Sequence, residues 1–235
     1  MTAETVAPGA TAATGAGTGR SARKRRAITA AATARFLRDG YRDTSMDQVA
    51  ADAAVSKQTV YKQFADKEQL FRAIVLGVTG NASAIIAELT AALPAAGVAT
   101  QQELGAALTA LARRYLDGVL QPPVLALRRL VIAEAERFPD LARTYFEQAP
   151  ARAIGVLAEA LRGYRARGLI AAQDPELAAA HFAYLTLAIP LDRAQFLPGE
   201  RPSAAERDRL AAEAVRVFLA AYAVAPVAPV APVAR

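Results

Sequence analysis

The stretch that decides the fold of this chain is residues 44–64, TSMDQVAADAAVSKQTVYKQF. Its apolar residues recur at the i, i+3 and i+4 spacing of a helical face: Met46, Val49, Ala50, Val60 and Phe64. Ser56 is a favoured N-cap residue and divides the stretch into two parts. The pattern predicts two short helices joined by a tight turn, one over Met46–Asp52 and one starting after Ser56.

The second predicted helix has an outer side rich in polar residues: Ser56, Lys57, Gln58, Thr59, Tyr61, Lys62 and Gln63. Side chains in the first turn of such a helix reach base edges when the helix lies in the major groove of DNA. Lysine suits the acceptors of guanine, and glutamine can form two hydrogen bonds with adenine. Tyrosine and lysine further along can reach phosphates. The alternative is an ordinary helical hairpin whose polar side chains face solvent.

Three residues outside this helix are candidate phosphate contacts. Thr44 and Ser45 precede the first helix, where hydroxyls and free backbone N–H groups suit a phosphate oxygen. Lys67 begins the next predicted helix, which Asp66 caps. Together with the second helix, these residues predict one surface for double-stranded DNA.

The charge of the chain is concentrated in the same region. Residues 1–72 contain 12 of the 28 Lys and Arg residues but only 7 of the 22 Asp and Glu residues. The remainder is therefore close to neutral, within a total net charge of +6. A basic module on a neutral body favours a polyanionic partner, although a solvated charged face is the alternative.

Several classes of site are disfavoured by composition. The chain has no cysteine and one histidine, His181, so disulfides and thiolate metal sites are excluded and a zinc site or histidine-based triad is disfavoured. It lacks carboxylate–histidine clusters and a phosphate-binding loop. We therefore expect no metal, no cofactor and no enzymatic activity. An apolar run of about 18 residues is also missing, so a cytoplasmic, nucleoid-associated protein without a membrane span is expected.

The rest of the chain predicts an all-α fold of about nine helices, with three small ones in front and a larger bundle behind. No strand pattern is found. Besides the two short helices, the periodicity and cap residues predict these: 21–40, 67–93, 101–120, 123–137, 140–167, 175–189 and 203–222. Pro190 is expected to end the helix before it.

The predicted elements divide the chain into four segments. Residues 1–19 are low in complexity and are expected to be a disordered arm. Residues 20–82, with the helix-turn-helix at 45–64, form the first domain, and residues 83–223 form the second. Residues 224–235 repeat Pro, Val and Ala and are expected to be an extended, disordered tail.

The region from about Ala22 to Ala82 resembles the DNA-binding domain of TetR/AcrR-type transcriptional regulators. The resemblance is carried by Thr44-Ser45, Val49-Ala50, Val55-Ser56-Lys57, Thr59-Val60-Tyr61, Phe64 and Asp66-Lys67-Glu68-Gln69-Leu70-Phe71. It implies that the helix after Ser56 enters the major groove. It also implies phosphate contacts for Thr44, Ser45, Tyr61 and Lys67.

Two positions depart from that family's pattern. Ala54 stands in the turn where the family often has glycine, which costs roughly 1 kcal/mol if the backbone is left-handed there. Gln63 stands where the family often has histidine. Glutamine can still donate to a phosphate, but the pattern does not fix its contact.

Residues beyond 120 are similar to the C-terminal domain of the AefR-like branch of these regulators. The similarity is carried by residues 127–141, LRRLVIAEAERFPDL, and by Gly168-Leu169-Ile170 with Asp174-Pro175-Glu176. It implies dimerisation and effector binding in this domain without identifying the effector.

A ligand pocket is predicted among the apolar side chains of the middle helices. The candidates are Leu89, Leu108, Leu111, Tyr115, Val119, Leu130, Phe146 and, as a polar member, Glu134. The alternative for each apolar residue is simple core packing. Arg129 and Glu134 are expected to be exposed or paired, because an unpaired buried charge is costly.

Two further surfaces have open interpretations. The Ala-rich helices 175–189 and 204–222 suit a two-fold four-helix interface, with burial inside one subunit as the alternative. His181 and Tyr184 form an i, i+3 pair that we assign to such packing. A basic cluster either follows the DNA backbone or is a solvated helix start: Arg20, Arg23, Lys24, Arg25 and Arg26.

These features favour a homodimeric repressor that binds a palindromic operator and is released by a small-molecule effector. An effector-independent activator or architectural DNA-binding protein is the alternative.

Overall fold

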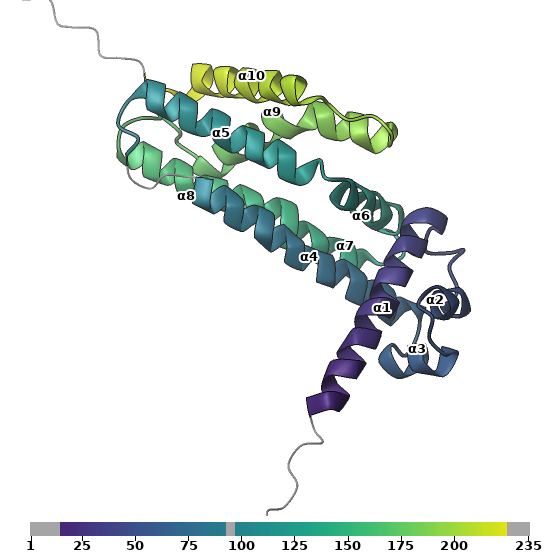
Figure 1. The fold of residues 1–235 in the computed structure, drawn as a ribbon. Helices are drawn as coiled ribbons and strands as arrows, with labels where there is room; N and C mark the ends of the chain where they lie inside the picture. Colours follow the sequence, from purple (N-terminus) through teal and green to yellow (C-terminus); the bar gives the residue numbers. More distant parts are fainter. Residues whose placement is uncertain (1–14, 93–96, 225–235) are drawn as a thin grey trace, which may run out of the picture. The chain divides into compact units, whose positions relative to one another are not determined.

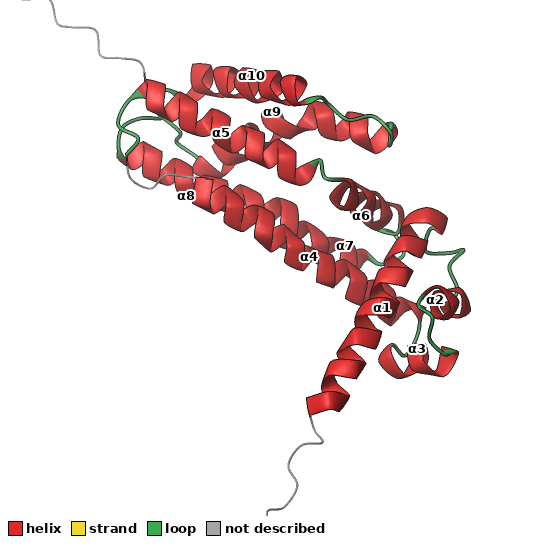
Figure 2. Ribbon diagram, in the orientation of Figure 1, coloured by secondary structure: helices red, strands yellow, loops and turns green. Residues whose placement is uncertain are grey.

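The computed structural model describes residues 15–92 and 97–224, and every regular element in those ranges is a helix (Figures 1 and 2). This confirms the predicted all-α fold. The α-helices are α1 (Gly15–Asp39), α2 (Met46–Asp52), α3 (Lys57–Gln63), α4 (Lys67–Ala92), α5 (Gln101–Val119), α6 (Pro122–Ala133), α7 (Pro139–Phe146), α8 (Arg152–Ala166), α9 (Pro175–Phe196) and α10 (Ala204–Tyr222). A π-helical turn, η1 (Glu147–Ala151), joins α7 to α8.

The chain folds as two compact units, Met1–Leu76 and Gly77–Arg235, hereafter the N-terminal and C-terminal units. Their division falls inside α4. The sequence-based boundary between residues 82 and 83 lies in the same helix. Each unit therefore has its own core, and α4 is the element that contributes residues to both.

The N-terminal unit is built on an aromatic cluster. The rings of Phe36, Tyr41 and Phe71 lie with centroids 5.0 to 5.7 Å apart, and all three are buried. Aromatic pairs at these distances add to the free energy of area burial. The cluster fixes the end of α1 against the start of α4.

The helix-turn-helix has the predicted bounds. Ser45 caps α2 in a capping box with Gln48, and Ser56 caps α3. Between them, Ala54 has φ of 52°, the only positive φ of a non-glycine residue in the described chain. The departure from glycine therefore falls at a left-handed position, where a Cβ costs about 1–2 kcal/mol.

The C-terminal unit is a helical bundle in which α9 packs on α8 and α10, and α10 also packs on α5 (Figure 1). Its core is continuous and mainly leucine and alanine, with Phe182 and Phe218 in edge-to-face contact. Gly118 of α5 lies close to Ile85 of α4, since a Cβ there would be 2.9 Å from the Ile85 side chain. The absent side chain thus allows α4 and α5 to approach.

Two helix ends differ from the sequence-based prediction. Helix α1 begins at Gly15, so Ser21 lies inside it and is not its cap. Of the arm predicted to be disordered, residues 15–19 are helical and 1–14 lie outside the described residues, as do 225–235 of the predicted tail. Helix α6 ends at Ala133, because the chain turns to bury Phe138, whose N–H donates to the Glu134 carbonyl.

Two prolines act differently from expectation. The single helix predicted over 140–167 is interrupted by η1, because Pro150 lacks the N–H of a regular α-helical turn. Helix α9 instead continues through Pro190 to Phe196, so the predicted break at Pro190 is wrong. The buried side chains on both sides of it, Leu187 and Ala194, stabilise the continuous helix by packing.

Candidate functional site

One side of α3 is exposed and polar. Lys57, Gln58, Tyr61 and Lys62 face solvent, whereas Val60 is fully buried. Because residues three and four apart share a helical face, the four exposed side chains form one continuous surface. We call these four residues the α3 face.

The α3 face is held loosely by its neighbours. The Lys57 ammonium lies 2.8 Å from an Asp47 carboxylate oxygen, and both side chains are about 60% exposed. This hydrogen bond raises the pKa of Lys57 and keeps it cationic. An ion pair so exposed contributes little to stability, so Lys57 can exchange Asp47 for another acceptor.

The hydroxyl residues next to the α3 face have structural roles as helix caps. The Ser45 Oγ accepts a hydrogen bond from the Gln48 backbone N–H, and the Ser56 Oγ accepts one from that of Thr59. The Ser56 and Thr59 hydroxyls are also 2.8 Å apart and share a hydrogen bond. These contacts fix where α2 and α3 begin.

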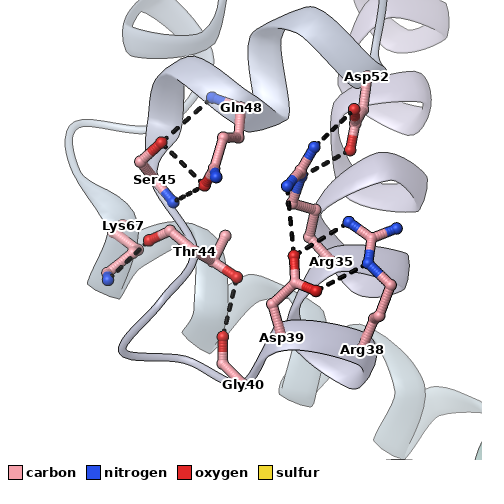
Figure 3. A network of polar contacts seen from close by, with 9 residues as sticks. All are labelled: Arg35, Arg38, Asp39, Gly40, Thr44, Ser45, Gln48, Asp52 and Lys67. Atoms are coloured by element: carbon pink, nitrogen blue, oxygen red, sulfur yellow. Dashed lines mark hydrogen bonds and ion pairs between the residues drawn. The ribbon is translucent and has the colours of Figure 1, made fainter.

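Lys67, the first residue of α4, contacts Thr44 in the loop before α2 (Figure 3). The Lys67 ammonium donates to the carbonyls of Tyr41, Arg42 and Thr44 at 2.8 to 3.1 Å. Thr44 is buried, and its hydroxyl donates to the Gly40 carbonyl at 2.8 Å. Both residues therefore hold this loop in place, and their phosphate contacts stay predictions.

Gln63 ties the end of α3 to α1. Its side-chain amide donates to the Ser21 hydroxyl at 3.0 Å, and its carbonyl accepts from the Arg25 guanidinium at 3.1 Å. The same guanidinium stacks over the Phe64 ring, 4.2 Å from its centroid. Arg25 is thus anchored, while the other members of the basic cluster are exposed along α1.

Ion pairs hold α1 against α2 (Figure 3). The Arg35 guanidinium donates two hydrogen bonds to the Asp52 carboxylate, at 2.7 and 3.0 Å, and one to Asp39. Arg38 also donates twice to Asp39. These hydrogen bonds hold the pKa of Asp52 and that of Asp39 below their ordinary value. The ion pair between Arg35 and Asp52 thus holds α2 in place beside α1.

The C-terminal unit contains a mostly apolar cavity of about 330 Å³. The volume is within the range typical of small-molecule sites. The lining comes from six helices and η1: Ile85, Ile86, Tyr115, Val119, Val124, Leu127, Arg128, Tyr145, Ala149, Pro150, Ala153, Ile154, Ala183, Tyr184, Leu187, Ala188, Leu191 and Asp192.

Only two of the seven apolar pocket candidates from the sequence, Tyr115 and Val119, line this cavity. Leu89, Leu108 and Leu111 are buried in the bundle core and do not line the cavity. The remaining two candidates also lie outside the cavity lining: Leu130 is buried elsewhere, and Phe146 is 53% exposed on the surface. Helical periodicity identifies apolar faces, but a face can meet either core or cavity.

Three polar lining residues, Arg128, Tyr145 and Asp192, were not predicted from the sequence. Arg129, which follows Arg128 in the chain, donates to the Ala194 carbonyl at 3.0 Å and does not line the cavity. The available signal was the pair of arginines within the apolar run 124–133. Sequence alone does not say which of the two faces inward.

Helix α9 also carries an exposed apolar stripe. Its members follow one another at spacings of seven, one, four and seven residues: Leu177, Tyr184, Leu185, Ile189 and Phe196. Ile189 and Phe196 are 70% and 82% exposed. His181 lies on the same exposed side, with its Nδ1 2.6 Å from the Tyr222 hydroxyl of α10. Contiguous exposed apolar residues on a folded domain mark an interaction surface.

The described residues hold neither a candidate metal cluster nor a candidate membrane-spanning helix. Across residues 15–92 and 97–224, no group of three or more His, Cys, Asp and Glu residues could hold a metal ion. In the same ranges, no helix combines the length and apolar character needed to cross a membrane.

Two family models match the chain. Residues 28–74 match the tetR family of bacterial regulatory proteins. Residues 106–224 match the C-terminal domain of AefR-like transcriptional repressors. Among curated proteins, none matches.

Solved structures similar to this chain are regulators of the same kind. A putative TetR-family transcriptional regulator from Mesorhizobium loti MAFF303099 is 41% identical, with a TM-score of 0.76, over 87% of this chain and 99% of that one. The flavonoid-responsive regulator FrrA is 31% identical, with a TM-score of 0.61, over 87% and 100%. A TetR-family regulator from Pseudomonas syringae pv. tomato DC3000 is 26% identical, with a TM-score of 0.64, over 86% and 98%.

Proposed function

Because the chain belongs to the TetR family of bacterial transcriptional regulators, with a C-terminal domain of the AefR-like kind, we propose how its parts divide the work. Residues 20–82 bind the operator, and residues 83–223 bind effector and dimerise. The protein acts as a homodimeric repressor that leaves DNA when a small organic molecule fills the cavity. The observation that carries this proposal is the exposed polar α3 face on a capped helix-turn-helix.

DNA recognition is assigned to the α3 face and its surroundings. Lys57 and Gln58, in the first turn of α3, read base edges, where lysine suits guanine and glutamine suits adenine. Tyr61 and Lys62 bind phosphates beside them. The remaining candidate DNA contacts are those that also cap or anchor helices: Thr44, Ser45, Ser56, Thr59, Gln63 and Lys67.

The operator is proposed to be a palindrome, because two copies of the chain related by a two-fold axis present two α3 helices. Those helices must lie about 34 Å apart, or a multiple of it, to enter successive major grooves. The exposed apolar stripe of α9 supports an interface between the two copies, since it is unpartnered in one chain.

Helix α4 is the proposed link between effector and DNA. Its Leu70 and Ile74 are buried in the N-terminal unit, while Ile85 and Ile86 line the cavity of the C-terminal unit. A ligand that contacts the second pair biases the position of a helix that the first pair anchors. Release then requires that the ligand bind the non-DNA-binding arrangement more tightly.

An electrophoretic shift of purified protein on the DNA flanking its gene tests this proposal, repeated with a panel of apolar candidate effectors. We expect a retarded complex that one class of compound dissolves, and the compound should be recovered unchanged. A shift that no compound affects would favour an effector-independent regulator. Conversion of the compound would favour an enzyme, and no shift on any duplex would overturn the proposal.

A further inference from the structure

The cavity of the C-terminal unit has one unusual lining residue, Arg128 of α6. Its Nε is enclosed and has no hydrogen-bond partner. The rest of the guanidinium pairs with no carboxylate of the described residues, but it does make a side-chain hydrogen bond with Tyr145. An enclosed guanidinium N–H without an acceptor is costly, so the fold does not fully satisfy Arg128.

No carboxylate of the cavity neutralises the Arg128 guanidinium. Among the lining residues, the single carboxylate is Asp192, an exposed residue of α9 that makes no ion pair with Arg128. The adjacent Arg129 is bonded to a backbone carbonyl outside the cavity. Two consecutive arginines on one helix thus differ, since Arg129 bonds a backbone carbonyl elsewhere while Arg128 borders the cavity.

Two phenols border the same space. Burial raises the pKa of Tyr115 to about 12 and also raises the pKa of Tyr145, which the Arg128 guanidinium partly opposes. Both side chains are therefore neutral near pH 7 and offer an O–H donor. The Tyr115 hydroxyl makes no hydrogen bond with any described residue.

The cavity thus combines an apolar wall with a cation and two O–H donors. Such a set suits an oxygen atom that carries negative charge, because charge-assisted hydrogen bonds are about twice as strong as neutral ones. The planar guanidinium can bind both oxygens of a carboxylate at once. The remaining lining residues are mainly aliphatic and suit an apolar body.

We propose that the effector is an organic acid whose apolar body lies among the aliphatic side chains and whose anionic carboxylate or phenolate group lies on Arg128. Tyr115 and Tyr145 donate to the same group. This inference rests on the proposed effector-responsive function and narrows it to one chemical class. A neutral hydrocarbon of the same size would bring no charged oxygen to the Arg128 guanidinium.

Calorimetric titration of the full-length protein at pH 7 tests this with two probes of the same shape, a naphthalene carboxylate and the neutral naphthalene carboxamide. We expect the carboxylate to bind about tenfold more tightly than the amide, or better. Arg128→Met should remove this preference while leaving the affinity for the amide nearly unchanged. Arg128→Lys should retain part of it.

The matched control is Arg129→Met, which removes the same charge from the same helix outside the cavity and should keep the preference for the carboxylate. Thermal unfolding of each variant checks that the bundle is intact. Tyr145→Phe, which keeps the ring, provides a second variant and should reduce the preference without abolishing it.

Three results would overturn the inference: equal binding of the two probes, a preference that survives Arg128→Met, or no binding of either probe. Each can be told apart from failure of the proposed function, which is read from DNA binding without any compound. If the protein binds its operator and only neutral compounds release it, the proposed function stands and the assignment of Arg128 fails.

Discussion

The α3 face and the cavity of the C-terminal unit differ in how much of the chain is needed to make them. The α3 face comes from seven consecutive residues, Lys57–Gln63, with a serine cap at one end. The cavity draws side chains from positions between Ile85 and Asp192. A surface built from one short helix can be predicted from the sequence, whereas a cavity depends on how six helices pack.

The largest effect that tests this comparison is expected from removing a core ring in either unit. Phe71→Ala should lower the free energy of unfolding of the N-terminal unit by about 3–5 kcal/mol, because Phe71 is buried between Phe36 and Tyr41. Denaturant unfolding followed by circular dichroism should show an early transition, with DNA binding lost.

The matched variant in the other unit is Phe182→Ala, since Phe182 is equally buried and contacts Phe218. It should instead weaken the C-terminal unit. If both variants shifted one common transition equally, the two units would not be separate cores.

Tyr61→Ala should weaken binding to all DNA sequences by a similar factor. A hydrogen bond to a charged group contributes about 1.5–3 kcal/mol, and Tyr61 is exposed on the α3 face. Fluorescence anisotropy on specific and random duplexes measures both affinities. Tyr61→Phe, which lacks only the hydroxyl, should show most of the loss, and a loss confined to the specific duplex would contradict a phosphate contact.

Gln58→Ala should change which sequence is preferred more than how tightly DNA is bound. Loss of a base contact costs about 1–3 kcal/mol at one position of each half-site. Competition among duplexes that vary at one base pair measures this. A uniform loss across all of them would move Gln58 into the class of phosphate contacts.

Ala54→Gly should stabilise the N-terminal unit by about 1 kcal/mol, because Ala54 has φ of 52° and glycine relieves the left-handed strain. The melting temperature should rise without a change in DNA preference. Ala53→Gly is the control, since Ala53 has φ of −79°, and it should destabilise. Equal effects of the two substitutions would rule out strain at Ala54.

The smallest effect concerns pH. The pKa of Asp52 and that of Asp39 are lowered by hydrogen bonds from Arg35 and Arg38, from an ordinary value of 3.8. The stabilisation that these two carboxylates give to the fold is therefore complete above pH 3.8 and is lost as pH falls through their folded-state pKa. The free energy of unfolding of the N-terminal unit, measured as pH is lowered, should fall in this range. Asp52→Asn should make it fall less steeply with pH.

The helix-turn-helix was predictable because its signals are local. Ser45, Ser56 and the spacing of Val49 and Val60 determine both helices, and the bounds of α2 match the prediction. A left-handed backbone at Ala54 was considered only as a condition, because alanine stands where the family often has glycine, and the φ of 52° meets that condition. Local caps and periodicity do not depend on the rest of the chain.

Features that depend on packing were predicted less well. Pro190 signals a helix end in isolation, yet α9 continues through it because its flanking residues are buried. Leu108 and Tyr115 lie on one helix and have similar apolar character, but only Tyr115 borders the cavity. Arg128 and Arg129 are adjacent and identical in type. Which of them faces inward is decided by the helices around them.

Selection of binding sites from a random duplex library tests the central claim most directly, with the wild-type protein and Gln58→Ala compared side by side. We predict that the wild type enriches an inverted repeat whose half-site centres lie one helical turn of DNA apart, or a multiple of it. The variant should keep that spacing and change preference at one base pair of each half-site. Enrichment of no sequence, or of a site without two-fold symmetry, would contradict the account.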